Sequence, residues 1–213
     1  MKKMIVIQHT QSEQHINRMI GSWGNWDLTE KGIRQTHAIG KRLAAEIENE
    51  RYIIYSSDLL RAKHTAEIIS GYLDTVPIYD SLLREFHLGE AIGQSKEWAK
   101  KNLLCPVWPD TIDWANTADG QVFRGAESRR DVWNRVSKFH QNVIASSHDN
   151  LIIVSHSGTL SILFALWLGM DIESLDKCNF SGKAGGVSFL NEDDAGHHII
   201  SRLGDMSYIQ EIE

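Results

Sequence analysis

The sequence predicts an α/β fold, a three-layer α/β/α sandwich with a mostly parallel central sheet and helices on both of its faces. Two observations lead to this prediction. Short apolar runs, which suit buried strands, alternate along the chain with longer segments whose apolar residues recur every three or four positions. Such an alternation of strands and helices is typical of a parallel sheet that is covered on both sides.

The first half of the chain supplies two strands, two helices and a further short apolar run. Thr29 has the residue type of a helix N-cap, and Asp58 is expected to cap the next helix. In order, the segments are a strand at residues 3–7, a helix at 29–49, a strand at 52–55, a helix at 59–72 and the run at 76–79.

The second half contains the clearest buried strand, residues 151–154. Before it, residues 80–125 have an irregular pattern, and we expect them to form an insertion that covers the substrate. The remaining predicted elements are helices at 127–145 and 159–168 and closing strands at 186–190 and 198–203.

Length and composition indicate one folded domain over residues 1–213. The chain has 213 residues, 42% of them hydrophobic and 23% charged, and no internal repeat or low-complexity linker divides it. The formal net charge of −6 argues against a general nucleic-acid partner, although it allows a local cationic pocket. We expect either a monomer or a homodimer.

The sequence also favours a cytoplasmic protein without a membrane partner. No stretch approaches the ~18 apolar residues of a membrane span, and the apolar run at the N-terminus is too short for a secretory signal. Cys105 and Cys178 are far apart in the sequence and are expected to be free thiols in a reducing compartment.

Chemically suited residues follow the predicted strands. His9 comes directly after the first strand and His156 directly after the strand at 151–154. Arg61 begins a helix after the second strand, and Glu85 follows the run at 76–79. Because ligands of α/β sheets bind outside the carboxyl ends of the strands, we expect these four side chains to converge.

This set of side chains suits phosphoryl transfer through a covalent intermediate. A neutral imidazole is a good nucleophile, and a guanidinium matches the oxygens of a phosphate. A second imidazole can donate to the same oxygens, and a carboxylic acid can protonate the leaving oxygen. The scheme requires neither a metal nor another cofactor, and its partner is a small phosphorylated molecule.

Six segments extend the pattern over most of the chain. They are Ile5–Thr10, Leu28–Gln35, Ser56–Ala66, Leu83–Glu85, Gly125–Ser128 and Val154–Gly158. In order and spacing they resemble the motifs of the histidine phosphatase superfamily, the phosphoglycerate-mutase-like enzymes, and within it the phosphatase branch.

The resemblance implies a role for each matching residue. His9 is the expected nucleophile, Arg61 and His156 are expected phosphate ligands, and Glu85 is the expected proton donor. Further contacts to the substrate or its phosphate are expected from Gln8, His15, Asn17 and Ser157.

Two departures from the family pattern bear on activity. Gln8 stands where the family has an arginine, which removes a charge-assisted phosphate contact. Thr10 replaces a glycine and adds a β-branched side chain where the backbone is expected to approach the phosphate. These departures lead to the hypothesis of weak or unusual activity.

Three functions are compatible with the sequence. The first is a phosphomonoester hydrolase that forms a phosphohistidine. The second is a phosphoglycerate-mutase-type phosphotransferase, which is disfavoured because the run Glu85–Gly89 lacks the Arg and Tyr that mutases use to hold a second anionic group. The third is a non-catalytic member of the fold that binds a phosphorylated ligand or acts in regulation, and Gln8 and Thr10 favour it.

Overall fold

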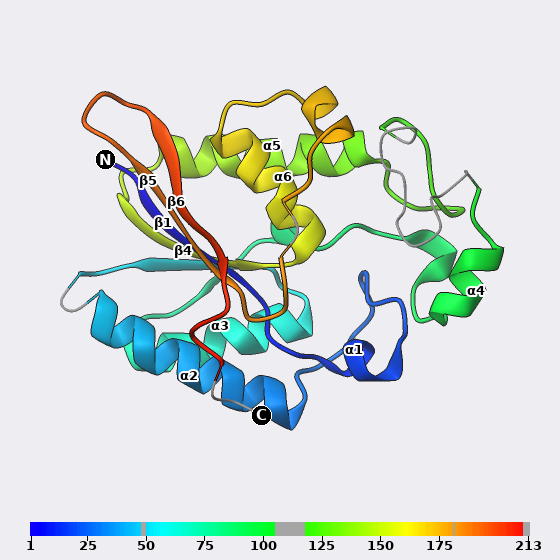
Figure 1. Cartoon of the computed structure of the whole chain (residues 1–213), viewed down its shortest axis with the longest axis horizontal. Coiled ribbons are helices and arrows are strands. Elements are labelled where there is room, and N and C mark those ends of the chain that lie inside the picture. The colour runs from blue at the N-terminus through cyan, green and yellow to red at the C-terminus, as the bar shows by residue number, and fades with distance from the viewer. Residues whose placement is uncertain (48–49, 105–117, 181, 211–213) are drawn as a thin grey trace.

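In the part of the chain that the computed structural model describes, residues 1–47, 50–104, 118–180 and 182–210, six strands form one sheet (Figure 1). The order across the sheet is β3-β2-β4-β1-β5-β6. β3, β2, β4 and β1 are parallel, whereas β5 and β6 pair antiparallel at the edge. The strands are β1 (Lys3–Gln8), β2 (Ile53–Ser56), β3 (Ile78–Tyr79), β4 (Asn150–Ser155), β5 (Val187–Glu192) and β6 (His198–Asp205).

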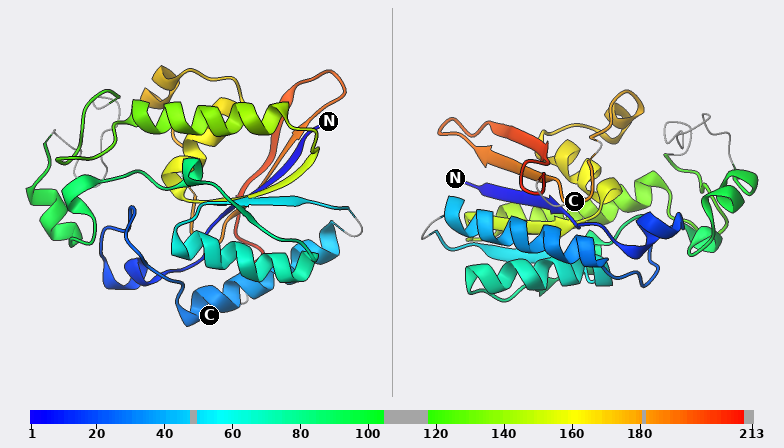
Figure 2. Two further views of the ribbon diagram at one scale, coloured as in Figure 1. Left: turned by 180° about the vertical axis from the view of Figure 1, so that it is seen from behind. Right: turned by 60° about the horizontal axis from the view of Figure 1, so that its bottom comes forward.

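Helices cover both faces of this sheet, as the sequence predicts. α2 (Glu30–Glu46) and α3 (Leu60–Leu73) lie on one face, and α5 (Arg129–Ala145) and α6 (Ser157–Trp167) lie on the other (Figures 1 and 2). The shorter helices are α1 (Glu13–Asn17), η1 (Ser81–Leu83), η2 (Gly89–Ala91), α4 (Lys96–Lys101) and η4 (Ile172–Asp176). The three-layer prediction and the mostly parallel sheet are confirmed.

The two faces of β1 contact different halves of the core. Met4 and Val6 pack in the cluster that contains the apolar residues of α5 and α6, whereas Ile5 and Ile7 pack in the cluster of α2 and α3. Because successive side chains of a strand point to opposite faces, a strand buried on both sides must be apolar throughout. This explains the unbroken apolar run at the start of the sequence.

Helix starts differ in part from the predictions. Thr29 does cap α2, since its side chain accepts a hydrogen bond from the amide of Gly32. The prediction for Asp58 is wrong: Leu59 occupies the N-cap of α3, and the Asp58 carboxylate instead pairs with Arg84, at 2.7 and 2.5 Å. α6 begins at Ser157, earlier than predicted, and α1 lies in a segment for which no helix was predicted.

The irregular segment 80–125 is only partly described. Its described part contains η1, η2 and α4 and packs a small core of its own, with Ala91, Val122 and Phe123 at the centre. Cys105 lies outside the described residues, while Cys178 is a free and exposed thiol. None of the described helices is long and apolar enough to cross a membrane.

Candidate active site

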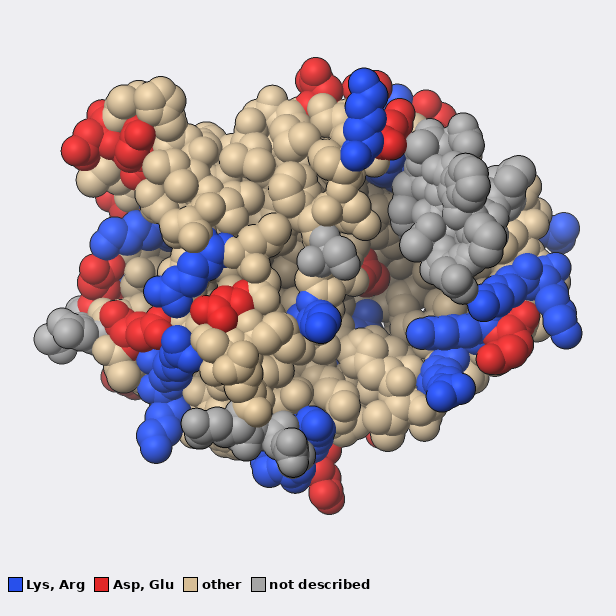
Figure 3. Space-filling view, in the orientation of Figure 1, with Lys and Arg blue, Asp and Glu red and all other residues tan. Residues whose placement is uncertain are grey.

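The carboxyl ends of β1, β2 and β4 meet at one end of the sheet, beside a cavity of about 730 Å³. His9 follows β1, Arg61 lies in the first turn of α3, and Glu85 follows η1; all three line the cavity. Figure 3 shows this face of the molecule hollowed, with lysine and arginine side chains around the hollow. The fold therefore brings together residues from separate parts of the chain, as the sequence predicts.

The two nitrogens of the His9 ring have different partners. Nδ1 lies 2.9 Å from the carbonyl oxygen of Thr10, so Nδ1 carries the proton, since a carbonyl oxygen only accepts. The lone pair of Nε2 then accepts a hydrogen bond from Nε of Arg61, at 3.1 Å. Burial lowers the pKa of His9 well below its ordinary value, and the charges of Arg61 and His15 lower it further. His9 is thus a neutral imidazole at pH 7.

The buried guanidinium of Arg61 is fixed by the turn at residues 22–24. Its Nη2 donates to the carbonyl oxygen of Ser22 at 2.7 Å, and its Nη1 donates to that of Gly24 at 3.3 Å. Burial lowers the pKa of Arg61 to about 10, while the charge of Glu85 acts in the opposite direction. Arg61 therefore remains a cation at neutral pH, next to the lone pair of His9.

His156 lies behind His9 at the end of β4. The centroids of the two rings are 5.1 Å apart, with the rings edge to face. His156 Nε2 is 2.9 Å from the hydroxyl of Ser57, and its Nδ1 is buried without a hydrogen-bond partner among the described residues. Burial lowers the pKa of His156 well below its ordinary value, and the Arg61 cation adds to the effect, with smaller contributions from His9 and Arg135.

The Glu85 carboxylate lies against the first turn of α6. Oε1 accepts from the amides of Phe86 and Thr159, at 3.0 and 3.2 Å. Oε2 accepts from the amide of Gly158 at 3.3 Å, and the hydroxyl of Ser157 is 3.5 Å away. Gly158 leaves room for this approach, since a Cβ there would lie 2.6 Å from Oε1. The contacts fix the carboxyl at the wall of the cavity that contains His9.

His15 and Gln8 also line the cavity. The His15 ring stacks on the His9 ring, with centroids 5.5 Å apart and planes 10° from parallel. Burial lowers the pKa of His15, as do the charges of Arg61 and Lys96. Gln8 is buried at the end of β1, and its Oε1 has no hydrogen-bond partner among the described residues. Both residues therefore lie at the same cavity as His9, and their contact with a phosphate stays a prediction.

Of the other two expected phosphate contacts, Ser157 and Asn17, only the first lies at the cavity. Ser157, the first residue of α6, lines the cavity. Asn17, the last residue of α1, is exposed and is not part of the cavity wall. The structure therefore does not bring Asn17 to the site.

The side chain of Thr10 is directed away from the cavity. Its hydroxyl lies 2.8 Å from the carbonyl oxygen of Gly32 and 2.8 Å from the hydroxyl of Thr36, both in α2. Thr10 is fully buried there and is not part of the cavity wall. Thr10 therefore fastens the segment after β1 to α2, and its effect on the approach of the backbone to a phosphate stays a prediction.

Sequence reasoning missed several residues of the site. Ser57, which contacts His156, stands in a motif that was recognised, so the motif itself contained the signal. Lys96 and Arg129 line the cavity, and no pattern in the sequence singled them out. The guanidinium of Arg129 is buried and pairs with Asp176, while its Nε and Nη1 have no partner among the described residues.

The charges of the cavity wall suit an anionic ligand. Arg61, Lys96, Arg129 and Lys177 are cationic, whereas only two of the lining residues, Glu85 and Asp176, are acidic. Within the described residues no group of three or more His, Cys, Asp or Glu side chains is arranged to hold a metal ion. In a chain of net charge −6, the cavity is thus a local concentration of positive charge.

A comparison with models of known protein families shows to which family the chain is related. The model of the histidine phosphatase superfamily (branch 1) matches residues 4–203. The chain belongs to the histidine phosphatase superfamily. A putative phosphoserine phosphatase 2 of Hydrogenobacter thermophilus is 30% identical over 82% of this chain and 83% of its own length. A probable phosphoglycerate mutase of Proteus mirabilis is 29% identical over 100% of this chain and 97% of its own length.

Solved structures of the superfamily share the fold. YhfR of Bacillus stearothermophilus superposes with a TM-score of 0.80 at 24% identity and covers 99% of this chain and 100% of its own. A mycobacterial glucosyl-3-phosphoglycerate phosphatase, complexed with VO3, superposes with a TM-score of 0.81 at 21% identity, covering 96% and 99%. The relatives thus include both phosphatases and mutases.

Proposed function

We propose that this superfamily member is a phosphomonoester hydrolase that acts on a small phosphorylated metabolite through a phosphohistidine at His9. The observation that carries the proposal is the protonation pattern of His9. Thr10 holds the proton on Nδ1, so the lone pair of Nε2 is directed toward Arg61 at the cavity wall. A phosphate paired with Arg61 would lie next to that lone pair.

In the first step, Nε2 of His9 attacks the phosphorus atom. The bond between phosphorus and Nε2 forms while the bond between phosphorus and the leaving oxygen breaks. The protonated carboxyl of Glu85 gives its proton to that oxygen, which departs as an alcohol. Arg61 lines the cavity, where it contacts the phosphoryl oxygens and stabilises the charge of the transition state. His156 is fully buried beside His9 and does not line the cavity, so its expected contact with the phosphate stays a prediction.

In the second step, water releases the phosphoryl group. The Glu85 carboxylate takes a proton from the attacking water, whose oxygen forms a bond to phosphorus as the bond to Nε2 breaks. Inorganic phosphate leaves, and both His9 and Glu85 return to their starting protonation states. The cycle consumes one water molecule and requires no further reactant.

The side chains next to Glu85 favour hydrolysis over mutase chemistry. Phe86 and Leu88 contribute apolar surface to the cavity wall. Because these positions fall in the segment where mutases have an Arg and a Tyr, the groups that would retain a second anion are absent from it. We therefore place the mutase reaction second.

The test is phosphate release from an aryl phosphate at mildly acidic to neutral pH. Turnover by the natural chain that disappears in His9→Ala supports the proposal. His197→Ala is a matched control, since this histidine is exposed and its side chain pairs with Asp193, outside the cavity wall. Absence of turnover by the natural chain would contradict the proposal and favour a non-catalytic ligand-binding role.

A further inference from the structure

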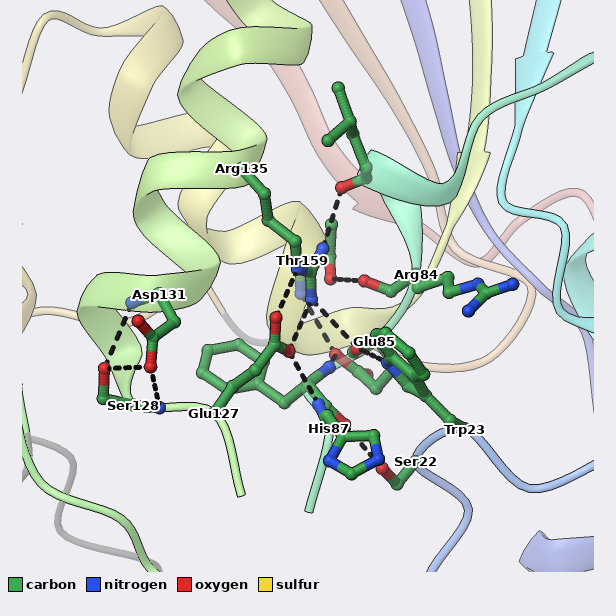
Figure 4. A network of polar contacts seen from close by, with 12 residues as sticks. Ser22, Trp23, Arg84, Glu85, His87, Glu127, Ser128, Asp131, Arg135 and Thr159 are labelled. Atoms are coloured by element: carbon green, nitrogen blue, oxygen red, sulfur yellow. Dashed lines mark hydrogen bonds and ion pairs between the residues drawn. The ribbon is translucent and has the colours of Figure 1, made fainter. Parts of the chain in front are cut away.

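Residues 82–87 form the segment that carries Glu85, and each of their backbone carbonyl oxygens accepts a hydrogen bond from another part of the chain. Figure 4 shows the part of this network around Arg135 and Glu127. Leu83, Arg84 and Phe86 are bound by the hydroxyls of Ser155, Thr159 and Ser22, at 2.7, 2.6 and 2.6 Å. His87 is bound by the amide of Glu127 at 2.7 Å. The backbone of residues 82–87 is therefore fixed by hydrogen bonds although most of it is not part of a helix or strand.

Arg135 of α5 donates two of these hydrogen bonds, one at Leu82 and one at Glu85. Its Nη1 donates to the carbonyl oxygen of Leu82 at 2.8 Å, and its Nη2 donates to that of Glu85 at 3.0 Å. The indole of Trp23 donates to the same Glu85 oxygen at 2.6 Å. Arg135 therefore contacts the backbone of the proposed acid itself, although it does not line the cavity.

Glu127 fixes the orientation of Arg135. Its Oε1 accepts from Nε of Arg135 at 2.9 Å, and its Oε2 accepts from Nη2 at 3.1 Å. The same Oε2 also accepts from the amide of His87 at 2.8 Å. Both side chains are mostly buried, with 13% of Arg135 and 20% of Glu127 exposed, so solvent screens this ion pair only weakly. Together they form a clamp around the segment 82–87.

The carboxyl of Glu85 has little freedom to adjust if its backbone moves. It fits between the amides of Phe86, Gly158 and Thr159, and a single added Cβ at Gly158 would collide with it. A general acid acts only within hydrogen-bond reach of the leaving oxygen. A small shift of the Glu85 backbone therefore moves its carboxyl group relative to the leaving oxygen that it protonates.

We propose that Arg135, oriented by Glu127, is a positioning residue for Glu85 and acts through the Glu85 carbonyl oxygen. This inference rests on the proposed function, in which Glu85 protonates the leaving group. Arg135 touches neither the phosphate nor the leaving group. Its contribution is greatest for substrates whose leaving oxygen needs a proton.

The test compares two substrates of similar shape in Arg135→Lys. Phenyl phosphate has a basic leaving group that depends on the acid, whereas 4-nitrophenyl phosphate has one that departs without a proton. We expect turnover of phenyl phosphate to fall by about ten- to a hundredfold, because a misplaced general acid loses that much. Turnover of 4-nitrophenyl phosphate should change by less than about threefold, since binding and His9 attack are intact. Glu127→Gln should shift the same ratio in the same direction.

Arg130→Gln is the matched control on the same helix. Arg130 is 42% exposed and pairs with Asp119 and Glu173, away from Glu85. Its substitution should leave both substrates unaffected. An equal loss for the two substrates in Arg135→Lys would overturn the proposal, because a role limited to folding affects all substrates alike. Unchanged turnover of phenyl phosphate would also overturn it.

A second readout does not depend on turnover. The amides of Phe86, Gly158 and Thr159 bind the Glu85 carboxylate, so their hydrogen exchange reports its position. We expect exchange at least about tenfold faster in Arg135→Lys and unchanged exchange in Arg130→Gln. Unchanged exchange in Arg135→Lys would overturn the positioning role.

The two readouts separate the two proposals. If the natural chain has no turnover, the hydrolase proposal fails, while the exchange measurement still decides whether Arg135 positions Glu85. If Arg135→Lys does not fold, both readouts are made on Glu127→Gln, and unchanged values there would overturn the proposal.

Discussion

At the scale of single residues, Gln8 is where the site departs most from its family. The side chain is buried in the cavity wall, and its Oε1 has no partner among the described residues. Gly182 lies beside it, where a Cβ would come within 2.7 Å of Oε1. The absence of a side chain at Gly182 therefore leaves space for the amide group of Gln8.

Gln8→Arg should raise the turnover of an aryl phosphate. A guanidinium at this position adds a charge-assisted contact of about 1.5–3 kcal/mol, which is about ten- to a hundredfold in rate if the contact acts in the transition state. Steady-state kinetics measures the change, and Gln8→Met controls for the size of the side chain. Equal or lower turnover in Gln8→Arg would show that the missing cation does not limit activity.

The protonation of His9 is a second property of a single residue. Burial depresses its pKa, and the Arg61 cation and the neighbouring His15 ring add to this, so the His9 ring should stay neutral well below the value of about 6.5 found in peptides. An NMR titration of the imidazole should therefore show no protonation of His9 at about pH 6. A midpoint at about 6.5 would contradict the described environment.

Much of the site could be predicted at this scale, and the reason is chemical. His9, Arg61 and Glu85 are residue types that phosphoryl transfer requires, and they follow strand ends in the sequence. The direction of Thr10 could not be predicted, because it depends on the packing of α2 against the segment after β1. The role of Arg135 could not be predicted either, since its partners are backbone carbonyls more than forty residues away in sequence.

At the scale of elements, the start of α6 leaves no room for a side chain at Gly158. A Cβ at Gly158 would lie 2.6 Å from Glu85 Oε1 and 2.8 Å from the ring of Phe86. Gly158→Ala should therefore displace the carboxyl and lower the turnover of phenyl phosphate by about tenfold or more. Kinetics on phenyl and 4-nitrophenyl phosphate tests this, and the loss should be larger for phenyl phosphate.

Gly71 provides the control for a glycine-to-alanine change in a helix. It lies in α3, and nothing is within 4 Å of a Cβ built there. Gly71→Ala should raise the free energy of unfolding by about 0.5–1 kcal/mol, because alanine is the better helix former, and should leave turnover unchanged. If Gly158→Ala behaves in the same way, its contact with Glu85 has no effect on the reaction.

The elements themselves were predicted best where burial dictates the sequence. β1 and β4 are apolar on both faces because helices cover both, so each stands out in the sequence as a short, unbroken apolar run. α1 was missed because it has five residues, too few for a periodic pattern. Asp58 was assigned to a cap on its residue type, yet its pairing with Arg84 depends on a segment that no local pattern brings close.

At the scale of the whole molecule, buried histidines make stability depend on pH. The pKa values of His9 and His156 are depressed in the folded protein and return to about 6.5 on unfolding. The unfolded chain therefore binds more protons as the pH falls below that value, and the folded state loses stability. His15 and His140 have lowered pKa values for the same main reason, burial.

Denaturant unfolding at about pH 7.5 and about pH 5.5 measures this effect. Each histidine that stays neutral in the folded state should reduce the free energy of unfolding by about 1.4 kcal/mol between these two values. His156→Gln should make the dependence on pH shallower, whereas the exposed His197→Gln should not. An equal free energy of unfolding at both pH values would contradict the claim that the buried histidines stay neutral in the folded state.

The sheet order has a consequence for how the enzyme is made. β4 lies between β1 and β2, although more than ninety residues separate it from β2 in the chain. A nascent chain that has emerged only through α5 contains His9, which follows β1, and Arg61, in the first turn of α3, but lacks β4, the strand that lies between β1 and β2. Because such long-range pairing forms late, the pocket cannot assemble before β4 has left the ribosome. The candidate active site therefore forms only while the last third of the chain is being synthesised.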